Sequence, residues 1–212
     1  MEWEGGTILS VSWEILNVVG ISAFAISGAI IAMEEKYDLF GAYVLGLVTA
    51  FGGGVIRNAL IGLPPDVLWK QELMIYVALV AITLVLFCPA KWFQYCKKWL
   101  NFFDAIGLAA FSVQGALYAS GKGLPLVAVI FAAVMTGIGG GMIRDLLAGR
   151  KPLVLQKEIY ALWSVITGVV IGLHWLEDGW QLLALCVLVV ALRMVSTIYG
   201  WHLPRIVQRK MG

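Results

Sequence analysis

The sequence predicts an all-α integral membrane protein with a single transmembrane domain over residues 1–212. Hydrophobic side chains make up 61% of the 212 residues and charged ones only 13%, whereas soluble domains are about half apolar. A membrane-spanning helix needs roughly 20 mainly apolar residues. The charges and prolines divide the chain into seven such stretches, at about 12–34, 39–61, 70–89, 99–119, 125–147, 157–176 and 180–199.

The second observation is an internal repeat. A shift of 87 residues aligns 15–62 with 102–149 without a gap, and 15 of the 48 pairs are identical. We interpret 12–89 and 99–176 as two copies of a three-helix unit. Because each copy has an odd number of spans, the second must cross the membrane in the opposite sense, so the repeats are inverted. The seventh helix, 180–199, lies outside them, and 200–212 forms a basic cytoplasmic tail.

The orientation follows from lysines and arginines in the short loops. With the N-terminus outside and the C-terminus cytoplasmic, only Lys70 and Lys122 lie in outer loops. The inner side then holds Lys36, Lys91, Lys97, Lys98, Arg150, Lys151, Lys157, Arg205, Arg209 and Lys210. This asymmetry predicts a multi-pass protein of the inner (plasma) membrane.

The third observation is a glycine triplet in each repeat, followed by an arginine. Glycine costs about 1 kcal/mol relative to alanine within a helix, so the triplets predict that helices two and five are broken there. A break leaves main-chain carbonyls uncovered near Thr49 and Thr136, and such oxygens can replace the water around a monovalent cation. The expected ion pathway comprises Thr49, Gly52, Gly53, Gly54, Arg57, Asn58, Thr136, Gly139, Gly140, Gly141, Arg144 and Asp145.

Two other interpretations of these residues remain open. Glycine-rich helix faces often serve only for close packing, and arginines near helix ends can extend to the lipid headgroups. An arginine within hydrocarbon needs a partner or water. Counting residues from the helix ends predicts that Asp104 and Asp145 surround Arg144, whereas Arg57 has only the amides of Asn17 and Asn58.

No enzyme site is indicated. The chain has no nucleophile and base in a recognisable arrangement, no metal-binding spacing and no phosphate-binding loop, so we expect no catalytic residue, resident metal or cofactor. The net charge of +2 does not call for nucleic acid, since the anionic inner leaflet suffices to explain it.

The duplicated unit, the paired Gly-Gly-Gly-x-x-Arg-Asn/Asp motifs and the seventh helix resemble prokaryotic trimeric intracellular cation (TRIC) channels over about 12–200. The resemblance implies a homotrimer with one pore per subunit around helices two and five, permeable to K⁺ or Na⁺, with membrane lipid as a further partner. The same bacterial family includes glycine uptake proteins. Asn17 and Asn58 depart from the expected aspartates, which leaves the outer half of the pathway more positive than the inner half.

Three functions are consistent with these features. The first is a passive channel for monovalent cations, chiefly K⁺. The second is a secondary transporter of a small solute such as glycine. The third is an assembly scaffold, which has no need of arginines within the membrane. The sequence does not separate the first two.

Overall fold

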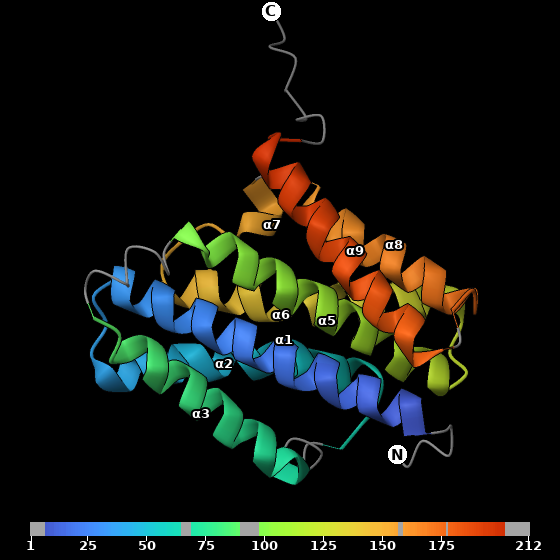
Figure 1. The fold of residues 1–212 in the computed structure, drawn as a ribbon, viewed down its shortest axis with the longest axis horizontal. Helices are drawn as coiled ribbons and strands as arrows, with labels where there is room; N and C mark the ends of the chain where they lie inside the picture. The colour runs from blue at the N-terminus through green and yellow to red at the C-terminus, as the bar shows by residue number, and fades with distance from the viewer. Residues whose placement is uncertain (1–6, 65–68, 90–97, 157–158, 177, 202–212) are drawn as a thin grey trace, which may run out of the picture.

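The structure is a computed structural model that describes residues 7–64, 69–89, 98–156, 159–176 and 178–201. Every regular element in these ranges is helical (Figure 1). The main helices are α1 (Thr7–Glu34), α2 (Leu39–Leu60), α3 (Glu72–Leu86), α5 (Leu100–Gly121), α6 (Leu126–Leu147), α8 (Tyr160–Gly172) and α9 (Gly179–Ile198), with the short elements η2 (Trp69–Gln71) and α7 (Leu153–Gln156). The predicted basic tail lies mostly outside the described residues.

Six of the described helices are long and apolar enough to cross a membrane, not the seven expected. The sixth predicted stretch, 157–176, contains α8, which has only 13 residues. At 1.5 Å per residue α8 is about 20 Å long, shorter than a hydrocarbon core of about 30 Å. The sequence overestimated its length because the apolar composition continues beyond the helix ends.

The repeat is visible in how the helices pack. Figure 1 shows α1 and α5 running side by side in opposite directions, as inverted repeats require. A Cβ atom on Gly20 would lie 2.9 Å from the ring of Phe111, and one on Gly107 would overlap the ring of Phe24. These two pairs are related by the 87-residue shift, and the rings of Phe24 and Phe111 meet edge to face with centroids 5.2 Å apart. The centre of the bundle is therefore a reciprocal contact between the repeats.

The predicted breaks at the glycine triplets are absent. Residues 52–54 lie within continuous α2 and residues 139–141 within continuous α6. The glycines serve close approach: a Cβ on Gly53 would overlap the carbonyl oxygen of Thr136, and a Cβ on Gly140 would overlap that of Thr49. The intrinsic helix penalty of glycine is thus outweighed by a tight crossing of α2 and α6. The packing interpretation of the triplets is the correct one in this conformation.

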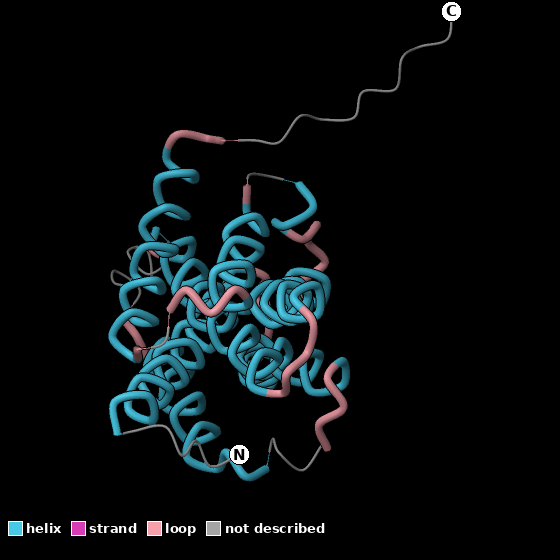
Figure 2. The backbone as a smooth tube through the Cα atoms, turned by 90° about the vertical axis from the view of Figure 1, so that its right-hand side faces the viewer, coloured by secondary structure: helices cyan, strands magenta, loops and turns pink. Residues whose placement is uncertain are grey.

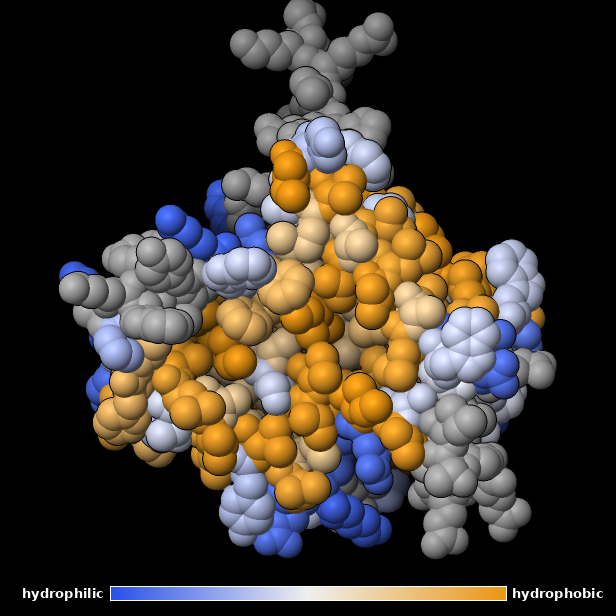
Figure 3. Space-filling model, in the orientation of Figure 1, coloured by the Kyte–Doolittle hydropathy of each residue, from blue (hydrophilic) through white to orange (hydrophobic). Residues whose placement is uncertain are grey.

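The outer surface is apolar, as a bilayer requires. Phe40 and Val127 are each more than three-quarters exposed, and the face in Figure 3 is hydrophobic over most of its area, with hydrophilic residues gathered toward the rim. Figure 2, turned by 90°, shows the helices bundled around one another, with the connecting loops at their ends. Arg57 and Arg144, two of the buried arginines, lie inside this bundle.

Candidate functional site

Equivalent chain turns place an arginine near the end of α2 and of α6. After α2 and α6, Gly62 and Gly149 adopt φ values of +67° and +69°, a left-handed conformation that costs glycine little. The amide of Leu63 then donates to the carbonyl of Asn58, and the amide of Arg150 to that of Asp145. Each arginine consequently sits in the last turn of its helix, facing the interior.

The crossing of α2 and α6 covers the oxygens expected to bind a cation. The hydroxyls of Thr49 and Thr136 each donate to the carbonyl four residues earlier in the same helix, at 2.6 Å in both cases. Both threonines are fully buried, and their own carbonyls lie against the opposite glycines. The uncovered main-chain oxygens predicted from the sequence are therefore absent in this conformation.

The remaining glycines of the two triplets also lie at or beside this crossing. A Cβ on Gly52 would lie 2.8 Å from the side chain of Ile143, and one on Gly139 would lie 3.0 Å from that of Ile56. Gly141 is buried. Gly54 differs, because its nearest neighbour is an arginine nitrogen at 3.8 Å.

Arg144 is held by two carboxylates, as predicted. Its Nη1 donates to Asp104 Oδ1 at 2.8 Å and to the hydroxyl of Ser27 at 2.6 Å. Its Nε and Nη2 lie 2.9 and 2.8 Å from Asp145 Oδ1, and the other oxygen of Asp145 accepts from the amide of Leu153. The guanidinium is 1% exposed. This end of the bundle is thus closed by a fully buried ion-pair cluster.

Arg57, the repeat equivalent, has no carboxylate partner among the described residues. Its Nε and Nη2 both donate to Asn58 Oδ1, at 3.1 and 2.9 Å, and the guanidinium carbon lies 3.9 Å from the ring centroid of Tyr118. Arg57 is 4% exposed. The predicted partner Asn17 forms no hydrogen bond to Arg57 in the described structure, although both line the same cavity.

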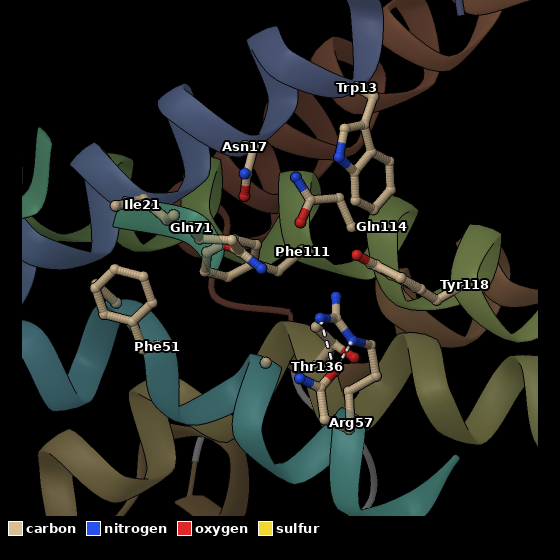
Figure 4. A pocket seen from close by; sticks show the side chains of 13 residues that line it. Trp13, Asn17, Ile21, Phe51, Arg57, Gln71, Phe111, Gln114, Tyr118 and Thr136 are labelled. Atoms are coloured by element: carbon tan, nitrogen blue, oxygen red, sulfur yellow. Dashed lines mark hydrogen bonds between the residues drawn. The ribbon is translucent and has the colours of Figure 1, made fainter. Parts of the chain in front are cut away.

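That cavity lies beside Arg57 and holds about 30 Å³ of space for the centres of water molecules, enough for at least one water. Figure 4 shows Asn17, Gln114 and Tyr118 gathered across it from Arg57. Towards the α2–α6 crossing it reaches Ala50, Gly54 and Thr136. The other lining residues are Trp13, Ile21, Phe51, Asn58, Gln71 and Phe111.

The sequence interpretation missed Gln114, Tyr118 and Ser27. Ser27 and Gln114 are repeat equivalents, 87 residues apart, so either one, once known as a neighbour of its arginine, indicates the other. Tyr118 aligns with Ile31, and nothing in the repeat indicates its contact with Arg57.

At the Arg144 end, surface contacts join the end of α1 and the loop after it to the end of α6 and the segment following it. Arg150 donates to Glu35 at 2.6 Å and to Glu34 at 2.8 Å, and the hydroxyl of Tyr37 donates to Leu147 O. Desolvation lowers the pKa of Arg150, but the hydrogen bonds and charges of the two glutamates outweigh it and hold that pKa above its ordinary value. Among the described residues, no group of three or more His, Cys, Asp or Glu is placed to hold a metal ion.

Comparison with known proteins places this architecture in a family. The family model described as "Glycine transporter" matches residues 14–90 and again residues 101–176, once in each repeat. This chain belongs to the glycine transporter family. Among related proteins, the membrane protein YvgT of Bacillus subtilis is 56% identical over 193 residues, covering 91% of this chain and 96% of YvgT.

Solved structures extend the relationship from the glycine transporter family to the prokaryotic TRIC channels, as the sequence motifs indicated. One, determined to explain conductance through TRIC cation channels, is 35% identical with a TM-score of 0.80 and covers 92% of this chain and 98% of its own. The TRIC trimeric intracellular cation channel orthologue from Rhodobacter sphaeroides is 28% identical with a TM-score of 0.80, covering 90% of this chain and 99% of its own. This family member therefore has the TRIC fold.

Proposed function

We propose that this chain is a channel for monovalent cations, chiefly K⁺, with one path in each subunit of a homotrimer. The supporting observation is the agreement with the TRIC cation channel structure over 92% of the chain at 35% identity. We place it in the inner membrane with the N-terminus outside, on the distribution of basic residues between loops. In this orientation the Arg57 cavity lies on the outer side.

The proposed path runs from that cavity, past Gly54 and Thr136, across the contact of α2 with α6. This contact is sealed by main-chain atoms packed on glycine, so the conformation described here is a closed one. Conduction requires the two helices to separate at the triplets, and glycine removes the side chains that would otherwise interlock there. Arg57 is the movable barrier at the outer entrance, because a guanidinium without a counter-charge repels an entering cation.

The test is K⁺ flux through purified protein in liposomes. The proposal requires unitary K⁺ currents when the protein is incorporated into planar bilayers. Saturable solute uptake without unitary conductance would exclude a channel.

A secondary transporter of glycine is the second candidate, and two observations favour it. The family model carries that description, and a buried arginine without an acidic partner suits the carboxylate of an amino acid better than a cation. Such a carrier would expose the cavity alternately to the two sides by rocking of the repeats. Counterflow of radiolabelled glycine in the same liposomes distinguishes it, since a channel does not exchange labelled for unlabelled solute in a saturable way.

A further inference from the structure

We propose that the cavity beside Arg57 binds a small carboxylate, such as acetate or the carboxylate group of glycine. The argument starts from the other repeat, where the corresponding position is filled. There, Nη1 of Arg144 donates to the carboxylate of Asp104 at 2.8 Å and to the hydroxyl of Ser27 at 2.6 Å. A carboxylate supplied by the chain itself thus occupies the interior in front of that guanidinium.

The same interior position in the first repeat lacks the acid. The 87-residue shift replaces Asp104 by Asn17 and Ser27 by Gln114, and both of these side chains line the cavity beside Arg57. The arginine is retained, buried to 4% exposure, while the charge that balances it in the second repeat is gone. The cavity therefore stands where the second repeat places its own carboxylate.

The cavity offers hydrogen-bond donors that the described structure leaves unused. Nε and Nη2 of Arg57 are bound to Asn58, and in Figure 4 the third guanidinium nitrogen points into the cavity toward Tyr118. Gln114 is 2% exposed, and its Nε2 has no hydrogen-bond partner. Figure 4 shows this amide across the cavity from Arg57, with its oxygen on the Arg57 side. A buried donor without a partner is costly, and a half-turn of the amide would direct Nε2 to a ligand with acceptor oxygens.

The geometry selects among possible ligands. The free edge of a guanidinium presents two parallel N–H groups, which match the two oxygens of a carboxylate better than a spherical halide. The space for water centres in the cavity is only about 30 Å³, which favours a small ligand, and an unbalanced guanidinium disfavours a cation. The proposal holds whether the chain is a channel, in which the ligand would neutralise Arg57, or a carrier, in which the carboxylate would belong to the solute.

Binding is tested without any flux measurement, so that its failure is distinct from failure of the proposed function. The full-length protein in detergent is titrated calorimetrically with sodium acetate and with sodium chloride at equal ionic strength, and then with glycine and glycinamide. We expect acetate to bind saturably and chloride and glycinamide not to bind. Glycine binds as well if the site accepts the carboxylate of an amino acid. Chloride binding as tightly as acetate, glycinamide binding as tightly as glycine, or no acetate binding would each overturn the proposal.

Two variants locate the site. Asn17→Asp restores the acid found in the other repeat, so it should fill the site internally and weaken acetate binding by at least about tenfold, the loss expected for one charge-assisted hydrogen bond. Asn17→Ala separates the two effects, because it removes the amide without adding charge, so it should weaken acetate binding less than Asn17→Asp does. Gln114→Leu should weaken binding while preserving side-chain volume. Unchanged acetate affinity in folded Asn17→Asp protein, verified by its thermal transition, would place the ligand elsewhere.

Discussion

At the scale of single residues, the two repeats use the same arginine in different ways. Arg144 is neutralised by Asp104 and Asp145, whereas Arg57 rests on an amide and an aromatic ring. A buried cation with ionic partners closes its end of the bundle, while one without them leaves a cavity. Two differences, Asn17 in place of an aspartate and Asn58 in place of another, thus give the two ends of the proposed path opposite net charge.

This asymmetry predicts unequal effects of removing each arginine. Arg144→Met leaves two buried carboxylates without a cation, and breaking a buried ion pair in this way costs about 3–5 kcal/mol. Arg57→Met leaves only an amide and a ring, so its cost should be about 1 kcal/mol, the size of one hydrogen bond. The measurement is the thermal transition of each purified variant in detergent. Equal losses would mean that the carboxylates around Arg144 are stabilised by other groups.

From the sequence we could predict the ion pair between Arg144 and Asp104, because both residues are charged and lie within apolar helices. Helix depth placed Asp104 level with Arg144, and the structure confirms the contact. The sequence could not show that Tyr118 lies over Arg57 or that Gln114 Nε2 lacks a partner. Both depend on how α5 is rotated against α2, which no sequence periodicity specifies. The transport role of these residues stays a prediction.

At the scale of helices, the glycine triplets show why local propensity misled. The helix penalty of three glycines is a few kcal/mol at about 1 kcal/mol each, and the sequence interpretation took it to break the helix. In the bundle, the missing side chains allow Gly53 and Gly140 to meet the opposite main chain, and the apolar surroundings force every peptide group to keep its helical hydrogen bond. The close packing of the glycines and the hydrogen bonding of their peptide groups therefore both favour a continuous helix.

A matched pair within one triplet tests this packing role. Gly53→Ala introduces a methyl group onto the carbonyl of Thr136, which is backbone and cannot rotate away, so we expect a loss of about 1–3 kcal/mol or more from overpacking. Gly54→Ala meets only an arginine nitrogen at 3.8 Å, and should be neutral or gain up to about 1 kcal/mol from helix propensity. The measurement is the thermal transition of each purified variant, compared with that of the wild type. If Gly53→Ala were tolerated as well as Gly54→Ala, α2 and α6 would not be in tight contact in the membrane.

At the scale of the whole molecule, the inverted repeat explains both what the sequence predicted and what it did not. The duplication was visible because 15 identities survive without a gap, and the reciprocal glycine and phenylalanine contacts of α1 and α5 follow from it. The length of α8 was overestimated, since hydropathy measures composition and does not detect where a helix ends. That a cavity lies beside Arg57 was also beyond the sequence, because it depends on side-chain volumes around that arginine.

The most direct test of the central claim, that the Arg57 cavity is the outer entrance of a cation path, is the unitary K⁺ conductance of Asn17→Asp beside that of the wild type. Both proteins are reconstituted into planar bilayers under identical salt. An aspartate at this position neutralises the guanidinium at the entrance, so the account predicts unitary currents in the wild type and larger ones in the variant. Absent currents, or currents of equal size in the two proteins, would contradict it.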